Sequence, residues 1–385
     1  MHGAVREIPA RARRARKPLD ERKAAGRRPR LARILGRVSV RSAVLAPFTV
    51  PSVRGNAVTV DRIVHGLRDR GVDVRVWDLS TTPEATIESE VHDYRPGVIH
   101  AFHAFRVGPL GLRVARQLDV PLVITLTGTD ANHDLFDPAR VDTVRRVLEG
   151  AVSLTVFHAS IAERVAAALP DVRSRLVVVP QSVRLDTGPA FDLASRWALP
   201  ARRCLFVFPA GIRMVKNPTM PLAPFDRLVQ RRPDVRLVYA GPILDAEEGA
   251  ALMRALESRP WARHVGAIPH REMASLLQQA DVVLNCSISE GGMANSVLEA
   301  LLMGRAVLAS DIEGNRTLID DGVTGLLFRD ADELESRAEQ LARDPALRER
   351  LGAAGRELVR RLYPPERELD GYLEVYRGVR AVPSA

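Results

Sequence analysis

The sequence predicts an α/β protein built from two doubly wound, Rossmann-like domains that face each other across a cleft. Three observations lead to this prediction. The chain has 385 residues, which suits two domains of roughly 150 residues each. Short β-branched runs alternate with amphipathic stretches, a pattern typical of parallel βαβ units. The alternation stops once, near residue 190, and then restarts.

The first predicted domain covers residues 38–185. Its strand-like runs are 42–46, 72–79, 97–102, 121–128, 153–159 and 175–182. The predicted helices between them include Val60–Asp69, Gly111–Leu118 and Ile161–Leu169. Because the runs are apolar on both faces, we expect helices on both sides of one parallel sheet.

Residues 186–202 are irregular and contain two prolines, one of them in a Gly-Pro pair, which predicts an interdomain linker with one short helix. The second predicted domain covers residues 203–362. Its strand-like runs are 204–211, 236–242, 264–269, 281–287, 305–310 and 325–328. Its predicted helices include 220–230, 246–256, 271–279, 296–303 and 332–343. Since ligands of such sheets bind at the carboxyl ends of the strands, two facing sheets would form one deep cleft.

The excess positive charge lies at the N-terminus. Residues 1–37 hold 13 Lys and Arg against 3 Asp and Glu, whereas the rest of the chain holds 43 against 44. We predict a disordered basic tail. It could be a solvated extension, or it could contact anionic lipid headgroups. No aromatic residue is interleaved with the arginines, which disfavours a nucleic-acid partner.

The two cysteines, Cys204 and Cys286, lie in apolar runs, so we expect buried thiols in a reduced protein. No run approaches the ~18 apolar residues of a membrane span. The N-terminus also lacks the apolar core of a secretory signal. We therefore expect a cytoplasmic location, with peripheral membrane contact through the tail left open.

A glycine-led turn, Glu290–Gly292, follows the strand-like run 281–287 and leads into the predicted helix 296–303. Glycine lets a ligand approach the backbone closely. The free N–H groups and the positive dipole at the start of the helix suit a diphosphate. The candidate ligand-binding residues of this loop are Gly291, Gly292, Met293, Ala294 and Asn295.

Two acids flank this turn. Glu290, at the strand tip, could meet the hydroxyls of a hexose, and Glu299, about one turn into the helix, could accept hydrogen bonds from a ribose diol. Asn295 or Ser296 is the expected N-cap. A plain strand–helix connection is the alternative, and a second glycine loop at 313–315 argues against it.

A basic cluster follows the first strand-like run of the second half. Arg213 and Lys216 could neutralise a pyrophosphate and stabilise charge on a departing nucleoside diphosphate. The alternative is a solvated loop that carries two ordinary cations. Since the cluster and the glycine-led turn both follow strands of one domain, we favour phosphate binding.

Polar residues also end the strand-like runs of the first half. Gly55 and Asn56 could approach the transferred sugar or the acceptor, or could form only a tight turn. His103 could bind sugar hydroxyls or assist proton transfer, or could be a structural histidine. The fourth run ends in further acceptor-side candidates, Thr127, Gly128 and Asp130. Asp130 could instead cap a helix over 131–135.

Metal and nucleophile patterns are weak. The nine histidines form no HxxxH or HExxH pair, and there is no cysteine cluster. The Asp330–Asp332 pair precedes a helix, so we expect a cap. No P-loop or GxSxG pattern occurs. The sequence therefore predicts neither a metal nor a bound cofactor.

These motifs resemble those of the retaining glycosyltransferase family 4, which has the GT-B fold. The similarity extends over about residues 41–375. It is carried by GNAVT (55–59), TGTD (127–130), GIRMVKNP (211–218), SEGGMAN (289–295) and EGN (313–315). The motifs are most similar to the group of glycosyltransferase 1 domain-containing protein 1. Selenosugar synthases share GN-x-VT, LTGTD and an EGG-x-N stretch.

The resemblance implies a UDP- or GDP-sugar donor, with UDP favoured, no metal, and retention of anomeric configuration. Arg213 and Lys216 would stabilise the diphosphate, which itself would assist deprotonation of the acceptor. Glu299 would hold the ribose and Glu290 the hexose or N-acetylhexosamine. Together with His103, the residues Arg213, Lys216 and Glu290 are the catalytic candidates. Residues 363–385 would form a last helix that crosses back onto the first domain.

The chain departs from the family pattern in three respects. Eight residues separate Glu290 from Glu299, one more than usual, and Arg213 lies closer to Lys216 than usual. Thr127 stands where many members have histidine. Two other functions stay open, a nucleotide-sugar 2-epimerase and a non-catalytic nucleotide-sugar-binding protein. The acceptor is not identified and could be a lipid, a glycan, a protein or a small molecule such as selenophosphate.

Overall fold

The computed structural model describes residues 40–52, 54–185, 188–290 and 292–380, and Arg380 only in its backbone. The predicted disordered tail at 1–37 lies outside the described residues. So do Gly291, the first two residues of the predicted linker, and residues 381–385.

The N-terminal sheet has six parallel strands in the order β2-β1-β3-β4-β5-β6. The strands are β1 Arg41–Ala46, β2 Asp73–Asp78, β3 Val98–Phe102, β4 Leu122–Thr125, β5 Ser153–Val156 and β6 Leu176–Val178. From β1 the chain proceeds to β2 on one side and then to β3 on the other. The strand order therefore reverses between β1 and β3, and the loops after these two strands start side by side.

Helices connect these strands: α1 Gly55–Asp69, α2 Glu84–Tyr94, α3 Gly108–Leu118, α4 Thr129–Asn132, α5 Val141–Gly150 and α6 Ala159–Ala168. The helix α1 begins five residues before the predicted Val60–Asp69. Its first turn forms because the Arg54 carbonyl accepts from the amides of Ala57 and Val58, at 2.9 and 3.3 Å. Periodicity alone starts the helix at Val60, because glycine, valine and threonine have low helix propensity.

The C-terminal sheet also has six parallel strands, in the doubly wound order β12-β11-β10-β7-β8-β9. They are β7 Cys204–Phe208, β8 Val235–Tyr239, β9 Ala262–His264, β10 Val282–Asn285, β11 Ala306–Ser310 and β12 Leu326–Phe328. Here the strand order reverses between β7 and β10. The prediction of two doubly wound α/β domains is thus confirmed strand by strand.

The C-terminal helices are α8 Leu222–Arg231, α9 Ala246–Leu256, α10 His270–Gln279, α11 Asn295–Leu302, α12 Glu313–Arg316, α13 Ala331–Arg343 and α14 Pro345–Leu362. A short helix, α7 Leu193–Arg196, lies within the predicted linker. Asp330 caps α13 by accepting from the amides of Asp332 and Glu333 at 3.1 and 2.9 Å, as the sequence predicts.

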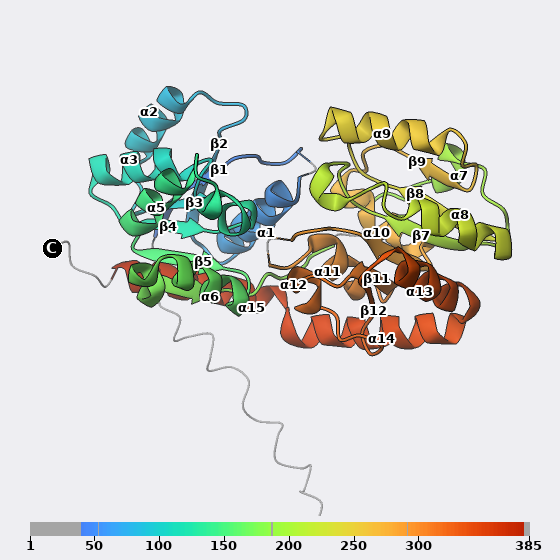
Figure 1. Ribbon diagram of the computed structural model, residues 1–385. Coiled ribbons are helices and arrows are strands. Elements are labelled where there is room, and N and C mark those ends of the chain that lie inside the picture. Colours follow the sequence, from blue (N-terminus) through green and yellow to red (C-terminus); the bar gives the residue numbers. More distant parts are fainter. Residues whose placement is uncertain (1–39, 53, 186–187, 291, 381–385) are drawn as a thin grey trace, which may run out of the picture. The chain divides into compact units, whose positions relative to one another are not determined.

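The last helix, α15 Pro365–Arg380, packs with the elements of the N-terminal sheet (Figure 1). The Glu368 carboxylate accepts from Arg62 of α1 at 2.8 Å, and both side chains are buried. The Tyr376 hydroxyl lies 2.7 Å from Nδ1 of His100 in β3. A buried ion pair and buried aromatic rings therefore attach the end of the chain to its first half.

Both cysteines are buried and unpaired, which confirms the predicted burial. Burial, with the nearby Asp281 carboxylate, raises the pKa of Cys204 to about 12. Cys286 is buried as well, and burial raises its pKa. Within the described residues, no helix combines the length and apolar character that crossing a bilayer requires.

Candidate functional site

The strongest cluster of predicted residues lies at the carboxyl ends of β7 and β10. These strands pair with each other at the point where the order of the C-terminal sheet reverses. Ligands of doubly wound sheets bind at such switch points. The loop after β7 leads to a short 3₁₀ turn, Met214–Lys216, and a hydrogen bond of 3.0 Å from the Ile288 amide to the Val215 carbonyl joins it to the loop after β10.

The two predicted catalytic groups Lys216 and Glu290 contact each other. The Lys216 ammonium donates to the Glu290 carboxylate, and both side chains are largely buried. Ser287 and Asn285 also donate to this carboxylate, at 2.6 and 3.2 Å. Burial alone would raise the pKa of Glu290, but the charge of Lys216 and these hydrogen bonds outweigh it and hold the pKa below its usual value.

Lys216 is also unusual in the composition of this chain. It is the only lysine after residue 37, and every other cation in that part of the chain is arginine. Lysine supplies a compact point charge with three donors, unlike the planar guanidinium. In a chain that otherwise uses arginine, this choice is a signal that sequence reasoning could have used.

Arg213 precedes the same 3₁₀ turn, and its side chain is exposed. Local desolvation nonetheless lowers the pKa of its guanidinium. The charges of Arg54 and Arg106 lower this pKa further, whereas the Glu290 carboxylate raises it. Arg213 therefore lies within electrostatic range of two arginines from the first half of the chain.

The start of α11 differs from the prediction. Asn295 and Ser296 are not the cap, because Ala294 occupies the N-cap position and no side chain caps the helix. Asn295 instead donates from Nδ2 to the Gly55 carbonyl and to Thr59 Oγ1, both at 3.3 Å. That prediction is wrong because a tertiary partner outcompetes the local cap. Its consequence is that the first amides of α11 carry no side-chain acceptor.

The other predicted members of this loop lie as follows. Gly292 has φ of 123°, a conformation that favours glycine, and Met293 and Ala294 are buried. Glu299 is also buried, and its carboxylate accepts from His270 Nε2 at 2.9 Å. Sequence reasoning missed His270 because it belongs to the start of a different helix.

The second glycine loop supports Glu290 from the other side. A Cβ atom built on Gly314 would lie 2.6 Å from the Glu290 Cβ, so only glycine allows this approach. Asn315 is fully buried and donates from Nδ2 to the Ser310 carbonyl at 2.9 Å and to Asn285 Oδ1 at 3.3 Å. The loop at 313–315 is therefore packed directly against the candidate site.

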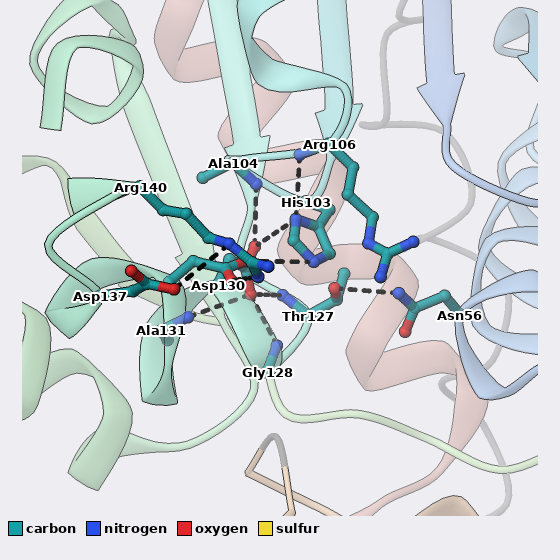
Figure 2. A network of polar contacts seen from close by, with 11 residues as sticks. Asn56, His103, Ala104, Arg106, Thr127, Gly128, Asp130, Ala131, Asp137 and Arg140 are labelled. Atoms are coloured by element: carbon teal, nitrogen blue, oxygen red, sulfur yellow. Dashed lines mark hydrogen bonds and ion pairs between the residues drawn. The ribbon is translucent and has the colours of Figure 1, made fainter. Parts of the chain in front are cut away.

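At the tip of β4, the Asp130 carboxylate is fully buried and orders the neighbouring turns (Figure 2). Oδ1 accepts from the amides of Thr127 and Gly128 at 2.9 and 2.8 Å, and Oδ2 accepts from the Ala104 amide at 2.9 Å. Gly128, not Asp130, is the N-cap residue of α4. Asp130 thus fixes the end of β4 against the turn after β3.

His103 lies at the end of β3 with φ of 105°, and its ring is buried. Its Nδ1 accepts from the Arg106 amide at 3.3 Å, which places the proton on Nε2. Among the described residues, Nε2 has no hydrogen-bond partner and is 3.8 Å from the Asp134 carboxylate. Within the described part of the chain, His103 is therefore not a structural histidine with both ring nitrogens hydrogen-bonded.

Further hydrogen bonds join the loops of the two halves. Asn132 donates from Nδ2 to the Glu290 carbonyl at 2.7 Å, and Arg164 pairs with Glu313. Within the first half, Asn56 donates to Thr127 Oγ1 at 3.2 Å (Figure 2). Asn132 and Arg164 had no motif to mark them, so the sequence offered no signal. No described set of three or more His, Cys, Asp or Glu residues is arranged to hold a metal ion.

Comparison with known proteins bears on the family and the fold. Residues 203–344, which contain the whole C-terminal sheet, match the family described as glycosyl transferases group 1. A glycosyltransferase 1 domain-containing protein 1 from Xenopus tropicalis is 25% identical over 324 residues, which cover 83% of this chain and 92% of the relative. A D-inositol 3-phosphate glycosyltransferase from Kribbella flavida is 29% identical over 68% of this chain and 66% of its own.

Two solved structures share the fold. HepE from Anabaena, in complex with UDP and glucose, superposes with a TM-score of 0.72 at 14% identity, over 88% of this chain and all of that one. Sucrose-phosphate synthase from Thermosynechococcus elongatus superposes with a TM-score of 0.74 at 18% identity, over 89% of this chain and 99% of that one. The resemblance stated from the motifs is confirmed in these respects: the relatives named above are glycosyltransferases, the chain has the GT-B fold, and its residues 203–344 form a glycosyl transferases group 1 domain.

Proposed function

We propose that the chain is a retaining transferase that moves a hexose or N-acetylhexosamine from a UDP-sugar to an acceptor. One observation carries the proposal. Arg213, Lys216 and the uncapped start of α11 all follow the two strands, β7 and β10, that flank one switch point. Two cations and free helix amides suit a diphosphate. The likeness to a protein crystallised with UDP and glucose favours uridine as the nucleoside.

In this proposal the donor inserts between groups that are already positioned. The diphosphate accepts hydrogen bonds from the α11 amides and the Arg213 guanidinium. The Lys216 ammonium donates both to a phosphate oxygen and to Glu290. Glu290 is held ionised by Ser287, Asn285 and Lys216, so it is ready to accept hydrogen bonds from hexose hydroxyls. Glu299 accepts from the ribose diol, and His270 keeps its carboxylate in place.

The proposed reaction needs no metal, since Arg213 and Lys216 neutralise the leaving group. The bond between the anomeric carbon and the phosphate oxygen breaks, and the acceptor nucleophile bonds to that carbon on the same face. The departing phosphate oxygen accepts the nucleophile's proton. His103, whose Nε2–H is buried without an acceptor in the described residues, would donate to a hydroxyl of the sugar or the acceptor.

A donor screen tests the proposal. Wild-type protein is heated with UDP-, GDP- and ADP-sugars, and the unfolding temperature is recorded. A ligand at 100 times its dissociation constant stabilises the native state by ~2.7 kcal/mol. We expect stabilisation by UDP-sugars and by UDP. Indifference to every nucleotide sugar would overturn the proposal.

Amine-specific labelling then locates the diphosphate. Lys17, Lys23 and Lys216 are the only lysines in the chain, and the first two lie in the basic tail. Saturating UDP should protect Lys216 from acetylation, measured by peptide mass spectrometry, while Lys17 and Lys23 serve as internal controls. Equal labelling of Lys216 with and without UDP would exclude it from the diphosphate site.

We also propose that the transfer occurs in the cytoplasm, because a reduced compartment suits the two unpaired thiols. The predicted tail at 1–37 leaves one choice open, between a solvated extension and contact with anionic lipid. Co-sedimentation of the full chain with phosphatidylserine vesicles decides it, against a chain that starts at residue 38. Binding that needs the tail and weakens with salt supports peripheral contact, and its absence supports the solvated extension.

A further inference from the structure

The N-terminal sheet has a switch point of its own, between β1 and β3. The loop after β1 contains Phe48 and Arg54, and the turn after β3 contains Arg106. These three side chains are brought together because β1 and β3 are neighbours in the sheet. Residues at such a position are placed to meet a ligand. In the proposed function, the acceptor would bind on this side.

One aromatic ring organises two cations there. The guanidinium carbon of Arg54 lies 4.2 Å from the centroid of the Phe48 ring, and that of Arg106 lies 5.7 Å from it. Cation–π attraction operates within about 6 Å. Phe48 therefore holds two like charges near each other, an arrangement that is unfavourable unless an anion offsets the repulsion.

No carboxylate of the described residues offsets them. Arg54 and Arg106 form no ion pair within that part of the chain, whereas other arginines of the same half, such as Arg62 and Arg113, pair with glutamates. Arg54 is also the N-cap residue of the 15-residue helix α1, whose first turn holds no acidic residue. The helix dipole adds positive potential at the same place. Figure 2 shows Arg106 extending past His103 on the side of Asn56, which belongs to the first turn of α1.

We infer that Arg54 and Arg106 bind a phosphate or similar doubly charged group of the acceptor substrate. This inference rests on the proposed function, because it assigns the acceptor of that transfer. Paired guanidinium groups match phosphate oxygens in geometry and in charge. The anion would lie near Arg213, whose guanidinium is within electrostatic range of both arginines, and so near the transferred sugar.

Phosphate titrations of UDP-saturated protein test the inference, because UDP then occupies the diphosphate site. Inorganic phosphate is titrated calorimetrically into wild-type protein, Arg54→Gln, Arg106→Gln and Phe48→Leu. Arg145→Gln is the matched control, since it removes one exposed charge of the same half. Loss of one charge-assisted hydrogen bond typically weakens binding about tenfold or more.

We expect phosphate to bind wild-type protein and Arg145→Gln equally and to bind each of the two other arginine variants at least tenfold more weakly. Phe48→Leu should weaken binding severalfold without a change of charge. UDP affinity, measured separately, should stay within twofold in all variants. Glycerol 3-phosphate is the second probe. If the site binds a phosphate ester, glycerol 3-phosphate should bind as tightly as inorganic phosphate. If the site binds only a free anion, glycerol 3-phosphate should bind more weakly than inorganic phosphate.

Two results would overturn the inference. One is equal phosphate binding, or none, in all variants. The other is a tenfold loss of UDP affinity in Arg54→Gln or Arg106→Gln, which would assign these cations to the donor. If wild-type protein does not bind UDP at all, the proposed function fails instead, and phosphate titration of the UDP-free variants still decides whether the two arginines form an anion site.

Discussion

The two switch points of this molecule use their charges in opposite ways. At the C-terminal one, each carboxylate already has a side-chain partner, since Lys216 contacts Glu290 and His270 contacts Glu299. At the N-terminal one, the Asp130 carboxylate accepts hydrogen bonds from backbone amides. Arg54 and Arg106, which both lie near the Phe48 ring, have no carboxylate partner among the described residues. The carboxylates of the C-terminal switch point are therefore already paired and positioned for a ligand. At the N-terminal switch point, the two arginines are left to pair with an anionic ligand.

The largest expected effect tests the claim that the Asp130 carboxylate is structural. Asp130→Ala leaves several buried amides without an acceptor, each costing about 1–3 kcal/mol. We expect the free energy of unfolding to fall by roughly 4 kcal/mol, measured by urea denaturation. The exposed Asp142→Ala in α5 is the control and should change it by about 0.5 kcal/mol or less. A loss of activity in Asp130→Ala with stability unchanged would point to contact with substrate instead.

The next effect tests whether the C-terminal switch point carries out donor turnover. Lys216→Ala should lower kcat/KM for donor turnover by ~10²–10³, about 3–4 kcal/mol of transition-state stabilisation. Lys216→Arg keeps the charge and should recover part of the rate. The rate is measured as UDP release, including slow hydrolysis of the donor by water. Near-wild-type turnover in Lys216→Ala would remove the ammonium from the mechanism.

How far the sequence predicts this molecule differs between backbone and side chains. All twelve strands lie within or overlap the predicted runs, because runs apolar on both faces mark buried parallel strands. The helix α9 matches its predicted range, whereas α2 was missed, since only Ile87 and Val91 of that helix are buried and they give little periodicity.

Short-range patterns in the sequence also predicted part of the candidate site. Glu290, Glu299 and Lys216 were singled out as candidates because short-range patterns place them at strand tips and at the start of a helix. Asn295 was misassigned as a cap, since its partners Gly55 and Thr59 are more than 230 positions away in the sequence. Phe48, Arg106 and His270 were not found, because only the strand order brings them to their partners.

A third effect concerns how the last helix is attached to the first half. Burial lowers the pKa of His100 to about 3, and its Nδ1 is 2.7 Å from the Tyr376 hydroxyl. The unfolded chain takes up a proton near pH 6.5, whereas the native state does so only near pH 3, so this contribution to stability is complete above pH 6.5 and is lost as the pH falls. Between pH 6.5 and pH 5 the loss is about 2 kcal/mol.

His100→Gln isolates this contribution. The variant should be less stable than wild type at neutral pH, and the difference should narrow by about 2 kcal/mol on going to pH 5, measured by urea denaturation at each pH. His65→Gln, at an exposed position in α1, is the control and should track the wild type. A constant difference between His100→Gln and wild type would mean that His100 titrates normally.

The smallest effect probes the rigidity of the C-terminal site. In Gly314→Ala the new methyl group would lie 2.6 Å from the Glu290 Cβ, so either the glycine loop or Glu290 must shift. We expect a loss of about 1–2 kcal/mol in stability, as for other overpacked sites, and a larger rise in KM for the donor sugar than for UDP as an inhibitor. Gly322→Ala is the control for a glycine with nothing within 4 Å of its built Cβ, although its φ of 79° adds some backbone strain of its own. If Gly314→Ala weakens UDP as much as the UDP-sugar, Glu290 does not contact the hexose, and the preorganised pair with Lys216 serves the diphosphate alone.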